Sequence, residues 1–123
     1  MRLLLDTQAV VWWLTADRRL SPAAREVLDG QETDLAVSAA SVWELAIKRA
    51  SGKYDGVDPA VALAGPGVAE IAITARHGDH AARLPLHHRD PFDRVIVAQA
   101  ILERRVLMTS DATLGKYGCA TLW

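Results

Sequence analysis

Short apolar runs alternate along this chain with longer stretches of helical periodicity, and this alternation limits the possible folds more than any other feature. Nearly continuous apolar strands separated by helices indicate a parallel sheet covered on both faces. Right-handed crossovers then put helices on both sides of the sheet. The predicted fold class is α/β, a three-layer α/β/α sandwich with a central parallel sheet. Its strands are expected at residues 3–5, 34–38, 68–74, 105–110 and 119–123.

Helices are predicted between these strands, and two of them carry clear start signals. Ser21 and Pro22 are typical of the N-cap and first position of a helix, here over 21–30. A Ser-x-x-Glu pattern predicts a capping box at the start of a helix over 41–52. The remaining helices are expected at 7–16, with Thr7 as a candidate N-cap, and at 58–64, 75–84 and 90–104.

The composition limits the setting and the class of protein. A chain of 123 residues, half of them hydrophobic, is expected to form one domain over 1–123 with a real core. The net charge of −1 excludes a generally basic nucleic-acid-binding protein, although a local basic patch is still compatible with it. A single cysteine cannot form an internal disulfide, and no apolar stretch has transmembrane length. We therefore expect a cytoplasmic protein that does not contact a membrane.

Four acidic residues, far apart in sequence, are expected to meet at one edge of the sheet. Asp6 ends the first predicted strand, and Asp111 follows the fourth. Glu44 lies in the first turns of the helix after the second strand, and Asp93 in the first turn of the helix that leads into the fourth. Parallel α/β sheets bind ligands at the carboxyl ends of their strands, where the strand order reverses.

Each of these acids also has an ordinary structural interpretation, because Asp and Glu favour helix starts. Asp6 and Asp111 could cap the helices that follow them. Glu44 could complete a capping box with Ser41, or pair with Lys48 one turn later.

The stretch HRDPFDR, residues 88–94, contains two acids that need separate interpretations. Asp90 directly precedes Pro91 and is best explained as the N-cap of the following helix. Asp93 lies on the first turn, where the positive end of the helix would help to orient a phosphate.

Four unpaired carboxylates gathered in one place would repel one another, and at least one pKa would rise. A divalent cation removes this repulsion, and oxygen ligands suit Mg²⁺ or Mn²⁺ rather than Zn²⁺. Such a site supports phosphoryl transfer to water, with one ion or with two ions about 3.5–4 Å apart.

The sequence motifs match a known family in order and spacing. LLLDT, VSAASVWELAIK, HRDPFDRVIVAQA and LMTSD follow one another along nearly the whole chain. This chain resembles the PIN-domain ribonucleases, specifically toxins of the VapC type. The resemblance implies a PIN-like fold and an Mg²⁺- or Mn²⁺-dependent endoribonuclease that is the toxin of a toxin–antitoxin pair.

The resemblance also implies particular residues and partners. The family's acids fall on Asp6, Glu44, Asp93 and Asp111, which would act as catalytic residues and metal ligands. Asp93 is preferred to Asp90 because the family's third acid is followed, after four residues, by Ala-x-Ala. The implied partners are the RNA substrate, a cognate antitoxin whose tail covers the acidic pocket, and a second copy of the chain.

Further candidates concern RNA binding. We expect contacts to the substrate from four residues near the acidic edge, Thr7, Arg89, Arg94 and Ser110. The four histidines lie among arginines, and three interpretations of this segment stay open: a solvated basic face, a surface for RNA phosphates, or a zinc site. These histidines are His77, His80, His87 and His88.

Other functions compete with the ribonuclease. One is an RNA- or protein-binding module that keeps the acids only as scaffold, and another is a nuclease acting on DNA. A phosphoaspartate-type phosphohydrolase also places an aspartate after its first strand, but the dehalogenase pattern Asp-x-Asp is here Asp-Thr-Gln at 6–8.

Overall fold

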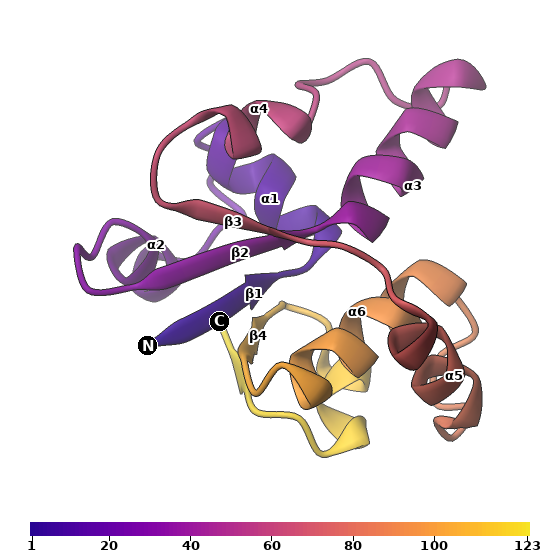
Figure 1. Ribbon diagram of the computed structural model, residues 1–123. Helices are drawn as coiled ribbons and strands as arrows, with labels where there is room; N and C mark the ends of the chain where they lie inside the picture. Colours follow the sequence, from indigo (N-terminus) through magenta and orange to yellow (C-terminus); the bar gives the residue numbers. More distant parts are fainter.

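The computed structural model describes residues 1–123 as five strands in one parallel sheet with helices on both faces (Figure 1). The strand order is β3-β2-β1-β4-β5, and every neighbouring pair is parallel. The predicted three-layer α/β/α fold is confirmed. The strands are β1 (Arg2–Leu5), β2 (Asp34–Ser38), β3 (Val68–Ile71), β4 (Val106–Met108) and β5 (Thr121–Leu122).

Six α-helices and one 3₁₀ helix connect the strands. They are α1 (Thr7–Leu14), α2 (Pro22–Leu28), α3 (Ala39–Ala50), α4 (Ala60–Ala64), α5 (Ala75–Arg83), α6 (Pro91–Leu102) and the 3₁₀ helix η1 (Ala112–Tyr117). None of these helices combines the length and the hydropathy that crossing a membrane requires.

The core has two layers, one on each face of the sheet, because alternate side chains of a strand point to opposite faces. In β1, Leu3 and Leu5 pack with buried residues of α1, α2 and α4, whereas Leu4 packs with those of α6 and η1. Figure 1 shows α1, α2 and α4 on one side of the sheet and α5 and α6 on the other. All three leucines are fully buried.

Strands β3 and β4 are shorter than the sequence predicts, because each pairs only as far as its neighbour extends. The pairing of β3 with β2 ends where Ile71 lies opposite Ser38, the last residue of β2. The pairing of β4 with β1 ends where Met108 lies opposite Leu5. After Ile71 the apolar residues Ala72 and Ile73 continue the sequence pattern but lie outside the strand, whereas β4 is followed by the polar residues Thr109 and Ser110.

The helix starts confirm some predicted caps and correct others. Ser21 and Asp90 cap α2 and α6 as predicted. The cap of α1 is Asp6 rather than Thr7. The cap of α3 is Ser38, so this helix starts before Ser41 and the capping box predicted there is wrong.

The strand order reverses between β1 and β4. From β1 the chain moves outward through β2 to β3, then returns to the other side of β1 to form β4 and β5. Asp6 follows β1 and Asp111 lies three residues beyond the end of β4, so both come from the adjoining strands at this switch point. The backbone N–H of Asp6 donates to the carbonyl of Met108 over 3.1 Å, which ties the two strand ends together.

Candidate active site

A pocket of about 440 Å³ lies at the carboxyl ends of β1 and β4. It brings together all four acids singled out in the sequence, together with Asp90. Its other lining residues are Thr7, Gln8, Val11, Leu45, Lys48, Lys53, Tyr54, Ser110 and Leu114. The convergence predicted from the strand ends is therefore present in the structure.

Asp6 lies at the buried end of this pocket, only 7% exposed. Its Oδ1 accepts a hydrogen bond from the backbone N–H of Ala9 over 2.7 Å, so one carboxylate oxygen caps α1. Burial raises the pKa of Asp6, and the nearby charges of Asp111 and Glu44 act in the same direction. The same carboxyl group therefore caps a helix and has a raised pKa.

Glu44 has both oxygens engaged. The hydroxyl of Thr7 donates to Oε1 over 2.8 Å and the ammonium of Lys48 donates to Oε2 over 2.9 Å. The hydroxyl of Ser41 is in turn 3.0 Å from that of Thr7. The predicted Glu44–Lys48 pair is present, while the partner expected from a capping box is replaced by Thr7 from α1.

Asp90 caps α6, as the sequence predicted, and Asp93 lies in the first turn of this helix. Asp90 Oδ1 accepts from the backbone N–H groups of Phe92, at 2.8 Å, and of Asp93, at 3.2 Å. Burial, and next the charge of Asp90, raise the pKa of Asp93 to about 7. Since its ordinary value is 3.8, this carboxyl group is one whose charge the surrounding protein does not compensate.

His88 lies between two of the acids, and sequence reasoning did not separate it from the other histidines. Its Nε2 is 3.3 Å from Oδ2 of Asp93 and 3.5 Å from Oδ2 of Asp111. The Nδ1 atom of the ring accepts a hydrogen bond from the backbone N–H of Asp90 over 3.1 Å, and the backbone N–H of His88 donates to the hydroxyl of Tyr117. The only sequence signal was its place two residues before the cap of α6.

Asp111 begins the last helical segment. Its Oδ1 accepts from the backbone N–H of Thr113, so it caps η1 as the sequence allowed, although the helix is 3₁₀ rather than α. Its backbone N–H donates to the hydroxyl of Thr109. Ser110 between them lines the pocket and is exposed.

The two arginines predicted to contact substrate lie outside the pocket lining. Arg94 is buried, and its guanidinium donates to a group of backbone carbonyls, those of Ala81, Leu84, Pro85 and His88. These bonds give Arg94 a structural role in joining α5 and the following loop to α6. Arg89 is exposed.

The other histidines do not line the pocket. His77 is 3% exposed; its Nδ1 accepts from the backbone N–H of Thr74, and its Nε2 is 2.9 Å from Glu103. It completes a capping box at the start of α5. His87 packs edge-on against Tyr117, and no histidine group forms a zinc-like cluster.

The chemistry of the pocket fits a hard divalent cation. Its lining contains five carboxylates and neither cysteine nor histidine, and oxygen ligands suit Mg²⁺ and Mn²⁺. As the side chains stand, no three acidic, histidine or cysteine groups are arranged to hold an ion, so its binding would require carboxylates to turn inward. Burial first, and then the neighbouring acids, raise the pKa of Asp6 and of Asp93, and a bound cation would lower both.

Comparison with known proteins gives the same family at the level of sequence. The PIN domain model matches residues 3–118. Ribonuclease VapC22 of Mycobacterium tuberculosis is 32% identical over 115 residues, which cover 90% of this chain and 88% of that protein.

Solved structures share the fold at lower identity. A chain of VapBC2 from Rickettsia felis, bound to a DNA fragment from its promoter, has a TM-score of 0.72 at 15% identity, covering 99% of this chain and 98% of that one. VapBC-1 from nontypeable Haemophilus influenzae has a TM-score of 0.67 at 18% identity, and the match covers 99% of this chain and 97% of that one. A chain of a toxin–antitoxin complex from Klebsiella pneumoniae has a TM-score of 0.61 at 21% identity, and the match covers 89% of this chain and 86% of that one.

Proposed function

The chain belongs to the PIN domain family, and from this premise we propose that it is a metal-dependent endoribonuclease of the VapC type, the toxin of a toxin–antitoxin pair. The observation that carries the proposal is the pocket itself. Four acids from four separate segments line it at the switch point of the sheet. The similarity to Ribonuclease VapC22 supports RNA as the substrate.

Asp6, Asp93, Asp111 and Glu44 are the residues we assign to holding Mg²⁺ or Mn²⁺. When bound, such an ion activates water and neutralises charge on the phosphate that is cleaved. Asp6 caps α1 and Asp111 caps η1, each through Oδ1, so Oδ2 of each carboxylate would be the oxygen that turns toward an ion. Asp93 lies in the first turn of α6, whose positive end would favour a phosphate.

The hydroxyls near the acids would position the ligands rather than react. Thr7 donates to Glu44 from the first residue of α1 and holds its carboxylate toward the pocket. Ser110 is exposed at the pocket, and we propose that it contacts the substrate. Arg89 is exposed just before the cap of α6, which is compatible with a contact to RNA outside the pocket.

The proposed partners are a cognate antitoxin and a second copy of the chain. Two of the similar structures are VapBC assemblies and another is a toxin–antitoxin complex, which supports an antitoxin partner here. Growth arrest on expression of the chain, relieved by the Asp93→Asn substitution, would support the toxin role. The mass of the purified chain in solution tests the homodimer.

The deciding experiment is cleavage of a panel of purified RNAs in Mg²⁺, Mn²⁺ or EDTA by the wild-type chain and by Asp6→Asn and Asp93→Asn. We expect cleavage with either ion, none in EDTA and none by the variants. Cleavage that persists in EDTA, or full activity in both variants, would overturn the mechanism. A binding module would retain RNA without cutting it in any condition, and a parallel DNA panel separates the two nucleic acids.

A further inference from the structure

We propose that Lys48 and Lys53 form a second contact for RNA at the pocket, binding phosphates beside the one that is cleaved. This inference rests on the proposed ribonuclease function and adds to it residues that bind the substrate. The two lysines are the only cationic side chains in the pocket lining. Neither was among the substrate-binding residues expected from the sequence.

The end of α3 brings the two lysines to the same pocket. After the helix ends, Gly52 adopts a φ of +73°, which reverses the chain direction at little cost for a residue without a side chain. The backbone N–H of Lys53 then donates to the carbonyl of Lys48 over 2.8 Å. Both side chains line the pocket as a result.

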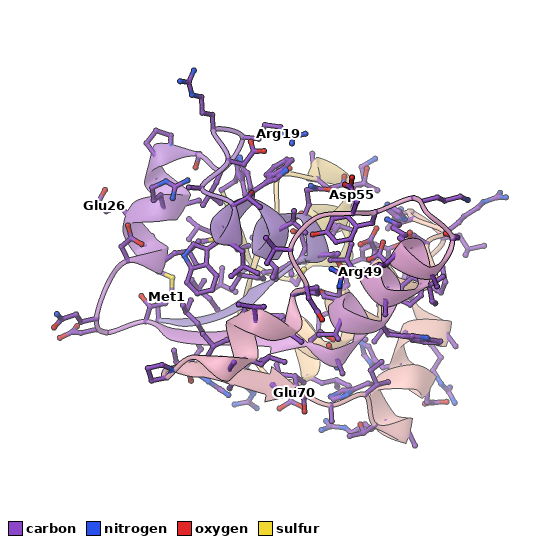
Figure 2. All side chains as sticks on the ribbon, turned by 90° about the horizontal axis from the view of Figure 1, so that it is seen from above. Met1, Arg19, Glu26, Arg49, Asp55 and Glu70 are labelled. Carbon is purple, nitrogen blue, oxygen red and sulfur yellow. The ribbon has the colours of Figure 1, made fainter.

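The segment that follows is held back along α3. The guanidinium of Arg49 donates to the carbonyl of Gly56 over 2.8 Å. Figure 2 shows Arg49 on the helix and Asp55 on the loop that curves back over it. Tyr54, the residue after Lys53, also lines the pocket and packs against the guanidinium of Arg49. The position of Lys53 is therefore fixed by contacts on both sides of it.

The charge of the pocket explains why these lysines would be needed to bind RNA. The pocket lining carries five carboxylates and two ammonium groups, so without a metal ion it repels an RNA backbone. A divalent ion would neutralise the acids around the phosphate that is cleaved, but it would not attract the phosphates on either side of that one. Phosphates bind chiefly to lysine and arginine, and here only Lys48 and Lys53 are available at the pocket.

The two side chains differ in what they contact in the absence of RNA. Lys48 pairs with the buried Glu44, while 47% of its own side chain is exposed. That pair would hold the ammonium at the pocket edge and allow it to turn toward a phosphate. Lys53 is exposed and makes no ion pair in the structure. Its charge is free for a ligand.

The test is RNA binding in place of cleavage. The Asp93→Asn chain, with Mg²⁺ present, is titrated into a fluorescently labelled single-stranded RNA over a series of NaCl concentrations. Lys48→Gln and Lys53→Gln are each added to this background, with Lys116→Gln as the matched control. Lys116, the one remaining lysine, lies on η1 and outside the pocket lining.

We expect each pocket variant to weaken binding severalfold at low salt and to reduce the log–log salt slope by about 0.7, the value for one phosphate contact to a single strand. The control should leave the slope unchanged. Lys48→Arg, which keeps the charge, should restore the slope lost in Lys48→Gln. If Lys48 served only to neutralise Glu44, its glutamine variant would bind RNA with the original slope.

Three results would overturn the inference: unchanged slopes in both pocket variants, an equal loss in the control, or no binding of RNA at low salt. Cleavage by the wild-type chain is measured separately and tests the proposed function. If the wild type cleaves RNA and the salt slopes are unchanged, the lysine contact is wrong and the nuclease proposal stands. If the slopes are reduced but the wild type does not cleave, the pocket binds RNA and the nuclease proposal is wrong.

Discussion

The Nε2 atom of His88 lies 3.3 Å from Oδ2 of Asp93, and the same nitrogen is 3.5 Å from Oδ2 of Asp111. Because Nδ1 of the ring accepts a hydrogen bond from the backbone N–H of Asp90, the proton of a neutral imidazole is on Nε2. One ring nitrogen thus connects carboxylates from α6 and from the start of η1.

Replacing His88 with Ala should destabilise the metal-free chain at neutral pH by about 1 kcal/mol, because two partly exposed carboxylates lose the polar ring nitrogen that lies between them. The attraction of His88 also lowers the pKa of Asp93, so that pKa should rise further in the variant. Urea unfolding in EDTA measures the loss, and His88→Gln, which keeps a donor, should recover part of it. Equal stability of all three chains would contradict the role assigned to the ring.

Asp93→Asn should reduce RNA cleavage by at least about 100-fold while the fold stays intact, as expected for loss of a group that acts on the reaction. Asp90→Asn should have a small effect, because asparagine is an equally good N-cap and can still accept from Phe92 and Asp93. Cleavage rates and circular dichroism spectra of the two variants provide the comparison. A large loss in Asp90→Asn alone would exchange the two roles.

The raised pKa of Asp93 predicts how metal-free stability depends on pH. The folded chain holds this proton more tightly than the unfolded chain, with a pKa of about 7 against 3.8. The contribution of Asp93 to folding is therefore fully present below pH 4 and is lost as the pH rises to about 7. Asp93→Asn lacks this loss.

The melting temperature of Asp93→Asn, minus that of the wild type, should accordingly grow between pH 5 and pH 8 in EDTA. The corresponding difference in the free energy of unfolding should grow by about 2–3 kcal/mol over this range, since each pKa unit corresponds to about 1.4 kcal/mol, which is on the order of 10 °C for a domain of this size. Mg²⁺ should narrow the gap, since it stabilises only the chain that binds it well. A difference that stays constant with pH would show that the Asp93 carboxyl is not perturbed in solution.

Arg94→Ala should destabilise the chain by about 3 kcal/mol, because it leaves several carbonyls near the end of α5 without their donor. Arg94→Lys should be almost as damaging, since one ammonium group cannot reproduce the fork of the guanidinium. Urea unfolding measures both. Cleavage per folded molecule should change little, whereas a substrate contact would lower it without affecting unfolding.

The fold and the meeting of the four acids were accessible from sequence because both follow from the strand pattern. A buried strand that ends in aspartate fixes that aspartate at the sheet edge, as Asp6 illustrates. The cap of α6 by Asp90 was also predictable, because it depends only on the residues that follow.

The partners of the site residues were not predictable, because they come from segments remote in sequence. Glu44 was assigned a local capping partner, but its hydrogen bond comes from Thr7, thirty-seven residues away. Arg94 was expected to contact the substrate, and it is instead buried, with its guanidinium donating to backbone carbonyls such as that of Leu84. Lys53 faces the pocket only because the chain turns at Gly52.

The pairing of β1 with β4 has a consequence for the order in which the pocket forms during synthesis. Asp6 leaves the ribosome well before β4 and Asp111, because Asp111 is 105 residues further along the chain. Domains generally fold as units once their sequence has emerged. A nascent chain that lacks β4 has no complete acidic pocket, so the four acids meet only after most of the domain has been synthesised.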